Sequence, residues 1–449
     1  MIMSELIEPG KRSRSASPSS FKKRARVDHP DADSSCIQLC NLPDEISYRA
    51  LAEKYPELKP YLVAESSQRS TLDFKNPDAV RVLNQALLST YFDLHIHLPS
   101  NSLCPTIANR LNYLKWLSAN ILPDFIPGHL TGLDIGTGAS CIYPLLGARY
   151  LPQCDFVGTD INEDSVTIAS RNVDRNELQS RIKVFLNTNR LTTLPLTTPG
   201  FPLPETDAGG ASFAFCMCNP PFYESIDERQ RLRQMKRGTP GLNTTAKDDE
   251  LYTDGGEESF LSGLVDESAI HNRRIKWFTT MVGKKSTLSI LKTKLRGVGV
   301  KQVREGVLIQ GRTTRWVLAW SFFGQGRFYL DVPQSPDETR AWLGQVMKEM
   351  SIDTVVAEAG SSGSVGSGVW YLCTAVERTW TRKWRRQVKA AGVETRTADQ
   401  EPVLRFRACV TSVASSRSAS SISLYLEAGF ESNDLMGLFN NLRRKLQLP

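Results

Sequence analysis

The stretch Ser212-Phe-Ala-Phe-Cys-Met-Cys-Asn219-Pro220-Pro221-Phe222-Tyr223 joins an apolar run to two prolines and an aromatic pair. The run is short, made of small and aromatic residues, and bounded by a turn signal, which predicts a buried strand. The prolines cannot continue a central strand, because each lacks an N–H group and has a fixed φ. The chain is therefore expected to leave a sheet in a stiff bend, with the Asn219 amide at the exit.

This bend suits a planar ring that carries an amino group. The side-chain carbonyl of Asn219 and the backbone carbonyl of a proline such as Pro220 can accept hydrogen bonds from –NH2. The ring of Phe222 can stack on the face of a base. Methyl transfer to an exocyclic amine needs such acceptors, which leave the nitrogen lone pair free to attack. A strand that merely ends at a proline turn would carry the same letters, so other parts of the chain must decide.

A second stretch, Leu130-Thr-Gly-Leu-Asp134-Ile-Gly136-Thr-Gly138-Ala-Ser-Cys141-Ile-Tyr, predicts a strand, a glycine turn and a helix. Glycines in the turn let a ligand approach the backbone, and the helix N-terminus offers free N–H groups. A nicotinamide fingerprint would need a third glycine at position 141, where this chain has cysteine. Together with Asp134 before the turn, this difference favours a pocket for S-adenosylmethionine over a dinucleotide pocket.

A further strand, Cys154-Asp-Phe-Val-Gly-Thr-Asp160, ends in an acid 24 residues after Gly136. An acid at this distance is where a doubly wound fold binds ribose hydroxyls. The strand that leads to Asn219 is the fourth in order, and such a sheet brings the carboxyl ends of its strands to one crevice. The sequence therefore predicts a Rossmann-like, class I α/β methyltransferase fold with these three elements around one pocket.

The 449 residues are too many for one ordinary core. Residues 1–40 are predicted to be a disordered basic tail, because Lys and Arg lie there among Ser and Pro. Residues 41–330 are predicted to form the methyltransferase domain, with a helical N-terminal extension that binds RNA. The composition breaks at Asp331-Val-Pro-Gln-Ser-Pro336, so residues 337–449 are expected to be a separate α+β module that also binds RNA.

Neither a metal nor a membrane is expected. The nine cysteines are scattered without any C-x-x-C pair, which argues against a zinc cage. His95 and His97 share one face of an expected strand, Asp93–Leu98, but no third ligand is near, so they are interpreted as surface residues. We find no apolar run long enough to span a bilayer and no signal peptide.

The net charge of +7 is concentrated in a few basic segments, which indicates a polyanionic partner. Solvated loops or helix faces would also explain these segments. The segment Phe21-Lys-Lys-Arg-Ala-Arg-Val27 resembles a nuclear localisation signal and predicts a nuclear protein; the cytoplasm, a plain basic tail or an RNA-contacting arm are the alternatives. The candidate RNA-binding residues are Arg229, Arg231, Lys236, Arg237, Lys284, Arg312, Arg315, Arg382, Arg385 and Arg386.

Four stretches resemble the methyltransferase-like-sixteen family: Leu133–Gly147, Phe215–Phe222, Gly283–Lys285 and Gln310–Phe322. This family comprises eukaryotic N6-adenosine methyltransferases of U6 spliceosomal RNA and is related to the bacterial ribosomal RNA enzyme RlmF. The resemblance covers about residues 41–325. It implies S-adenosylmethionine as the donor and U6 snRNA as the partner, and a C-terminal module similar to the family's kinase-associated-1-like RNA-binding domain.

The resemblance also implies roles for single residues. Gly136 and Asp160 would hold the donor, Arg110 would lie near its carboxylate, and Leu191 would belong to a loop that gates the pocket. Asn219 would contact both donor and target, while Pro220, Pro221 and Phe222 would grip the adenine. The target is expected to be an unpaired adenosine in structured RNA, because the base must be unstacked.

Two other classes of function remain open at this point. The Asn-Pro-Pro-Phe motif also serves enzymes that methylate glutamine in proteins or adenine in DNA, and ribosomal or other RNAs are alternative substrates. A non-catalytic RNA-binding adaptor with a relict pocket is the other class. The basic segments favour nucleic acid, and the intact Gly136, Asp160 and Asn219 favour catalysis.

Overall fold

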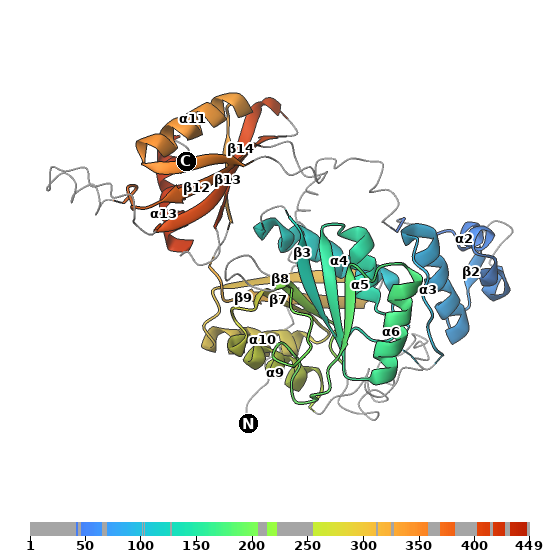
Figure 1. Cartoon of the computed structure of the whole chain (residues 1–449). Coiled ribbons are helices and arrows are strands. Elements are labelled where there is room, and N and C mark those ends of the chain that lie inside the picture. Colours follow the sequence, from blue (N-terminus) through green and yellow to red (C-terminus); the bar gives the residue numbers. More distant parts are fainter. Residues whose placement is uncertain are drawn as a thin grey trace, which may run out of the picture.

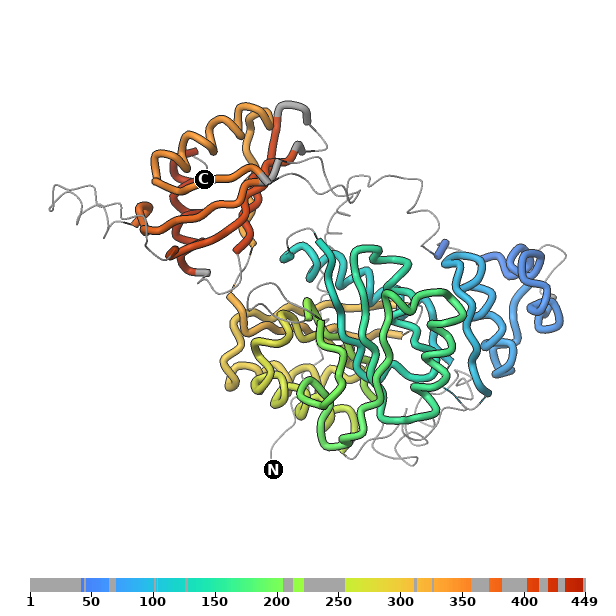
Figure 2. The backbone as a smooth tube through the Cα atoms, viewed as in Figure 1, coloured from blue at the N-terminus to red at the C-terminus, as the bar shows by residue number. Residues whose placement is uncertain are grey.

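The chain forms an α/β domain, called the methyltransferase domain after its prediction from the sequence, and a C-terminal module (Figure 1). The computed structural model describes residues 42–43, 46–64, 70–100, 102, 104–125, 128–204, 213–221, 255–310, 313–324, 327–357, 369–381, 402–413, 416–426 and 432–446. Figure 2 shows that the described segments from residue 42 to residue 324 build the first unit, and that the orange and red segments build the second. Within these residues, every helix is too short or too polar to cross a bilayer.

The methyltransferase domain is built on a seven-stranded sheet with the order β5-β4-β3-β6-β7-β9-β8. The first five strands in this order run parallel, and β9 and β8 continue the sheet antiparallel. The strand order reverses between β3 and β6, where a doubly wound fold binds its ligand. The strands are β3 (Leu130–Ile135), β4 (Cys154–Asp160), β5 (Ile182–Leu186), β6 (Phe213–Cys218), β7 (Ile275–Val282), β8 (Gln302–Gln310) and β9 (Thr313–Ser321).

Helices cover both faces of this sheet, and the sheet separates two apolar cores. On one face, Leu114 of α4 packs with Tyr143 of α5 and Val173 of α6. On the other face, Leu264 of α9 packs with Leu291 of α10. All six residues of β6 are buried, as predicted for the run before Asn219. These helices are α4 (Ile107–Asn120), α5 (Ile142–Tyr150), α6 (Glu163–Arg175), α9 (Gly256–Ile270) and α10 (Lys285–Gly297), with a short η3 (Leu122–Asp124) after α4.

The N-terminal extension lies beside α5 and α6 and has an apolar cluster of its own (Figure 1). It comprises α2 (Tyr48–Lys54), η2 (Pro56–Tyr61), β1 (Leu62–Ala64), β2 (Ser70–Leu72) and α3 (Pro77–Phe92). Asn76 caps the N-terminus of α3, because its side chain accepts a hydrogen bond from the Asp78 N–H group at 2.9 Å. Leu58 and Leu87 belong to the cluster and are buried.

The expected strand Asp93–Leu98 is absent, and Asn172 of α6 and its C-cap Asn176 take the place of a neighbouring strand. The Asn176 amide accepts from the His95 N–H group at 2.8 Å and donates to the His95 carbonyl at 2.8 Å. Asn172 makes the same pair of bonds with His97, at 2.7 and 3.0 Å. The segment is therefore extended, but side-chain amides satisfy its backbone groups. Both histidine side chains are exposed.

The C-terminal module is an antiparallel five-stranded sheet with the order β10-β14-β13-β12-β11, packed against α11 and α13. The α+β class is as expected, but the sheet begins earlier than the composition break indicates, because β10 pairs with β14. The module boundary thus lies near residue 325, before Asp331. The elements are β10 (Arg327–Val332), α11 (Pro336–Glu349), β11 (Ile352–Ala357), β12 (Val369–Ala375), β13 (Leu404–Val413), β14 (Ser416–Leu426) and α13 (Ser432–Lys445).

Candidate active site

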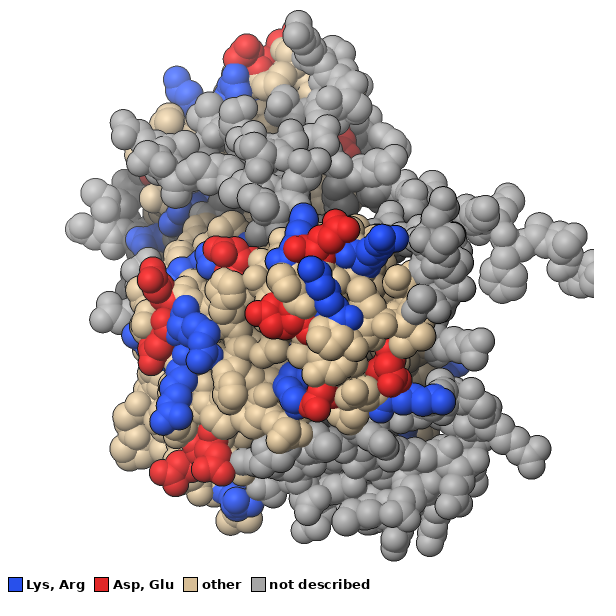
Figure 3. Space-filling view, turned by 90° about the vertical axis from the view of Figure 1, so that its right-hand side faces the viewer, with Lys and Arg blue, Asp and Glu red and all other residues tan. Residues whose placement is uncertain are grey.

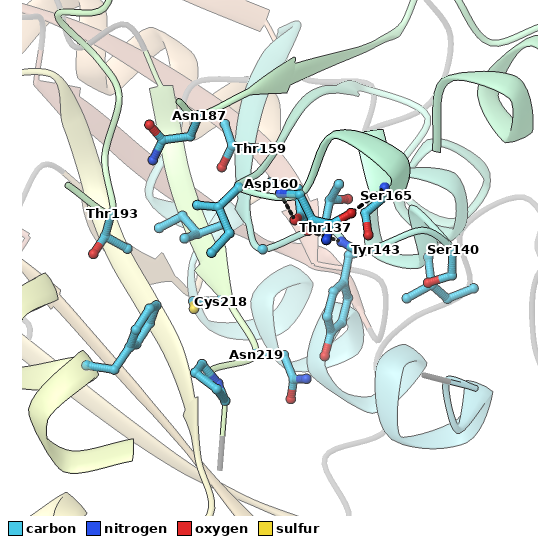
Figure 4. A pocket seen from close by; sticks show the side chains of 18 of the residues that line it. Thr137, Ser140, Tyr143, Thr159, Asp160, Ser165, Asn187, Thr193, Cys218 and Asn219 are labelled. Atoms are coloured by element: carbon cyan, nitrogen blue, oxygen red, sulfur yellow. Dashed lines mark hydrogen bonds between the residues drawn. The ribbon is translucent and has the colours of Figure 1, made fainter. Parts of the chain in front are cut away.

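A pocket of about 250 Å³ lies at the carboxyl ends of β3, β4, β5 and β6, at the point where the strand order reverses. Figure 4 shows Asn187 and Thr193 on one side of it, Tyr143 and Ser140 on the other, and Asn219 between them. The sequence-predicted residues that line it are Arg110, Gly136, Gly138, Asp160, Asn219 and Pro221. The predicted convergence of these residues on one crevice is therefore confirmed.

One wall of the pocket is the turn Gly136–Gly138 together with Asp160, called the glycine wall below. Gly136 and Gly138 have φ values of +71° and +62°, which favour glycine over residues with a side chain. The Asp160 carboxylate accepts from the Gly138 N–H group at 2.8 Å and from the Asn162 N–H group at 2.9 Å. Carboxylate oxygens have further lone pairs, so Asp160 can hold the turn and still accept from a ribose diol.

Asp134 lies behind the glycine wall and is fully buried. Neither of its carboxylate oxygens has a hydrogen-bond partner among the residues described. Burial raises the pKa of Asp134 to about 7; the Thr137 side chain and the Arg110 charge oppose this rise, and Asp160 adds to it. Burial outweighs the Thr137 side chain and the Arg110 charge, so the Asp134 carboxylate can still gain from a cationic group such as the ammonium of S-adenosylmethionine. Asp134 does not itself line the pocket.

Arg110 reaches the pocket from α4. Its guanidinium lies 5.4 Å from the centroid of the Tyr143 ring, and its Nη1 donates to Oδ1 of Asn219 at 3.3 Å. The buried Nε has no partner in the described part of the chain. Burial raises the pKa of Tyr143 to about 12, so the ring beneath the guanidinium is neutral. The free donor capacity of Arg110 fits a carboxylate ligand.

Hydroxyl groups from the neighbouring strand fix the end of β6 that carries Asn219. Thr279 of β7 donates to the Cys216 carbonyl at 2.7 Å, and its oxygen also lies 2.6 Å from the Tyr113 hydroxyl. Thr280 donates to the Cys218 carbonyl at 3.4 Å. Burial raises the pKa of the Cys216 thiol to about 12, so this cysteine packs as a small neutral side chain, as predicted.

The opposite wall is the segment 187–194 after β5, called the loop wall below. Asn187 begins it and is buried; its N–H group donates to the Asp160 carbonyl at 2.8 Å. Glu267 of α9 holds the far end: it accepts from the Thr193 N–H group at 2.7 and 2.9 Å, and from the Leu194 N–H group at 2.8 Å. The loop wall therefore depends on a helix far along the chain.

The comparisons with known proteins agree with this geometry. The sequence model of an RNA methyltransferase family matches residues 41–324. The chain belongs to this family. A U6 small nuclear RNA (adenine-(43)-N(6))-methyltransferase of Caenorhabditis briggsae is 37% identical over 292 residues, which cover 61% of this chain and 59% of that one. The resemblance to the methyltransferase-like-sixteen family is thus confirmed.

Solved structures of the same family share the fold. The hMettl16 catalytic domain in complex with MAT2A 3′UTR hairpin 1 matches with a TM-score of 0.56 at 35% identity, covering 62% of this chain and 92% of that one. The N-terminal domain of human METTL16 in complex with SAH matches with a TM-score of 0.50 at 35% identity, covering 62% and 95%. The class I fold is therefore confirmed. The chain spans 59% to 66% of the length of three curated relatives.

One predicted donor-binding residue of this family member lies outside the pocket in this structure. Leu191 was expected in the pocket, yet its side chain is 93% exposed and does not line it. The Asn189 side chain accepts from the Leu191 N–H group at 3.0 Å, and this turn directs residue 191 outward. Its neighbours Arg190, Thr192 and Thr193 line the pocket instead.

The sequence analysis missed several lining residues, among them Ile161, Asn187 and Phe260. Asn187 directly follows β5, and Asp160 is the last residue of β4, so the position of Asn187 at the same sheet edge could have indicated it. Ile161, next to the predicted acid, could have been found in the same way. Phe260 lies on α9, and no pattern in the sequence around it predicts that it lines the pocket.

The other predicted residues either do not line the pocket or lie outside the described residues. Pro220 is buried but does not line the pocket. The Lys284 N–H group donates to Glu257 at 3.1 Å, so its turn fixes the start of α10. Arg315 is half-buried on β9 and donates to the Thr314 carbonyl at 3.0 Å. The predictions that lie outside the described residues concern the tail 1–40 and Phe222, Arg229, Arg231, Lys236, Arg237, Arg312, Arg382, Arg385 and Arg386.

Proposed function

We propose that this protein transfers a methyl group from S-adenosylmethionine to N6 of an unpaired adenosine in structured RNA, and that U6 snRNA is its substrate. The observation that carries the proposal is the position of Asn219 at the end of β6, in the same pocket as the glycine wall. The named activity of the relative from Caenorhabditis briggsae supports the U6 substrate, and the SAH-bound human structure supports the donor.

The pocket offers complementary groups for each part of the donor. Asp160 would accept from the ribose hydroxyls, Arg110 would bind the carboxylate, and the buried charge of Asp134 would favour the ammonium group. When bound, the donor supplies an electrophilic methyl group on a sulfonium centre. These residues bind and orient it, and no side-chain nucleophile is required.

Asn219 and Pro220 would orient the attacking amine. Their carbonyl oxygens accept hydrogen bonds from the N6 amino group, which leaves the nitrogen lone pair aimed at the methyl group. Thr279 and Thr280 keep the strand end in place through its carbonyls. Catalysis then arises from positioning and from polar contact with N6, and Phe222 would stack on the base.

Surface charge guides where RNA would bind. On the face that carries the N-terminal extension, Lys and Arg alternate with Asp and Glu (Figure 3). Because phosphate binding needs a field of one sign, we expect this face to contribute little affinity. The C-terminal module carries exposed Arg405 and Arg407 on β13 and exposed Arg443 and Arg444 at the end of α13, which suit phosphate contacts. The basic segment at residues 21–27 supports a nuclear location.

A substrate competition tests the proposal. The purified protein is incubated with S-adenosylmethionine carrying an isotopic methyl label and a mixture of U6 transcript, ribosomal RNA fragments, duplex DNA and glutamine peptides. We expect labelled N6-methyladenosine in U6, located to one adenosine by nuclease mapping. Label in glutamine or DNA, or no label in any substrate, would overturn the assignment.

A further inference from the structure

Arg110 and Asn219 meet in the pocket although they lie 109 residues apart in the chain. Nη1 of Arg110 donates to Oδ1 of Asn219 at 3.3 Å, and both residues line the pocket. In the proposed reaction, the same oxygen must accept from the adenosine amine. In this arrangement a cation therefore contacts the very atom that should orient the substrate.

The support beneath Arg110 is firmer than its bond to Asn219. The guanidinium lies over the Tyr143 ring, whose hydroxyl donates to Met281 at 3.2 Å and whose edge packs on Tyr113 at 5.7 Å between centroids. The bond of 3.3 Å to Asn219 is long for an N–H···O bond, whose usual length is about 2.9–3.0 Å. The guanidinium also has an unused buried Nε. A stronger hydrogen-bond acceptor could thus replace Asn219 as the partner of the guanidinium without moving the Tyr143 ring.

A carboxylate is that better acceptor. Arg–carboxylate hydrogen bonds are charge-assisted, often bidentate, and roughly twice as strong as bonds between neutral groups. We propose that Arg110 occupies the amide oxygen of Asn219 until the donor's carboxylate binds the guanidinium, so that the protein holds its target amine only after its donor. This inference rests on the proposed function and adds an order of binding to it.

The order has a physical benefit for the reaction. Unstacking the target base costs a few kcal/mol. A base bound before S-adenosylmethionine cannot be methylated, so this cost would bring no reaction. The terminal torsion of an asparagine is broad, so the Asn219 amide can turn its oxygen toward the amine once Arg110 leaves it. Donor and RNA therefore bind cooperatively through one shared atom.

The test measures the contribution of the N6 amino group to RNA binding. Two short RNAs are compared, one with the methylated adenosine and one with purine riboside, which lacks the amine, at that position. With S-adenosylhomocysteine, the protein should prefer adenosine by about fivefold to tenfold, the size of one good hydrogen bond. Without ligand, or with saturating 5′-methylthioadenosine, which lacks the carboxylate, the two affinities should be nearly equal.

Variants at two arginines, one in the pocket and one outside it, make the test specific. In Arg110→Met, the preference for adenosine should be present without any ligand, and S-adenosylhomocysteine should bind more weakly. Arg149→Met, on α5 and outside the pocket lining, is the matched control and should keep the dependence on S-adenosylhomocysteine. The ligand comparison on the unmodified protein needs no variant, so it stands even if Arg110→Met folds poorly.

The outcomes separate this inference from the proposed function. If the protein methylates N6 but prefers adenosine equally with and without S-adenosylhomocysteine, the order of binding is overturned and the activity stands. An equal effect of 5′-methylthioadenosine also overturns it, because the carboxylate would then be irrelevant. If the protein neither binds S-adenosylhomocysteine nor methylates RNA, both proposals fail.

Discussion

The two walls of the pocket are held by different kinds of contact. The glycine wall is fixed within one β–α–β unit, because Asp160 binds Gly138 and the Thr137 N–H group donates to the Thr159 carbonyl at 2.8 Å. The loop wall is fixed by Glu267, which lies 73 and 74 residues further along the chain. The first wall therefore needs only its own unit, whereas the second is in place only when α9 has docked.

The largest expected effect concerns the buried charge behind the glycine wall. The pKa of Asp134 is about 7 in the folded protein, in place of 3.8. The folded protein therefore binds a proton at this carboxyl group more tightly than the unfolded chain does. The contribution of this proton to the free energy of unfolding is complete below pH 3.8. It decreases as the pH rises toward 7, by about 4 kcal/mol in all. Asp134→Asn should remove this loss, so the variant should gain stability relative to the natural protein between pH 5 and about pH 8.

Urea unfolding of the donor-free protein at several pH values measures this difference. Asp266→Asn, at an exposed carboxylate of α9, controls for the loss of one charge. A stability difference between Asp134→Asn and the natural protein that does not change with pH would contradict the role of burial.

Glu267→Ala should have the next largest effect and should act on the loop wall alone. It leaves the Thr193 and Leu194 N–H groups without their acceptor, at a cost of about 3 kcal/mol. Glu267→Gln keeps one carbonyl oxygen and should lose less than half as much. Donor affinity, measured by calorimetry with S-adenosylhomocysteine, should fall with stability across the two variants. An unchanged affinity in Glu267→Ala would show that the loop wall does not contribute to the site.

Gly136→Ala tests the glycine wall with a smaller change in stability. At a φ of +71°, an alanine costs about 1–2 kcal/mol, and among the described residues only the chain neighbours of Gly136 can lie within 4 Å of the added methyl group. The methyl group faces the pocket, so donor affinity should fall more than stability does. Gly263→Ala, inside α9 and also without close neighbours, should instead stabilise the fold by about 0.5–1 kcal/mol. An equal donor affinity in both variants would contradict the conclusion that the glycine wall contacts the donor.

Leu191→Ala should have the smallest effect. Its side chain is 93% exposed, so its removal should change stability by less than about 0.5 kcal/mol. Donor affinity should stay within about twofold, because Arg190 and Thr193 form the wall on either side. A large loss of donor affinity in this variant would mean that Leu191 turns inward when the donor binds.

The features that sequence predicts well are those set by neighbouring residues. The strand before Gly136, the acid at 160 and the buried run before Asn219 all follow from local apolar patterns and turn residues. The Asn76 cap of α3 is equally local, because it depends on a contact only two residues away. The doubly wound topology then brings these local features to one crevice.

The features that sequence predicts poorly depend on distant partners. The segment 93–98 alternates like a strand, but Asn172 and Asn176 pair with it in place of a sheet. The strand β10 was assigned to the wrong unit, because its partner β14 lies about ninety residues away. Leu191 was placed in the pocket by resemblance, and only the turn at Asn189 shows that it points outward.

Methyl transfer by Asn219→Ala is the most direct test of the central claim, that Asn219 orients the amine at the edge of the donor pocket. Transfer to N6 is followed by mass spectrometry of digested U6 transcript, and donor binding by calorimetry on the same preparation. We expect the rate of transfer to fall by about 100-fold or more, as for the loss of one polar contact to the reacting group, with donor affinity within about threefold of the natural protein. An N6-methylation rate equal to that of the natural protein would contradict the account.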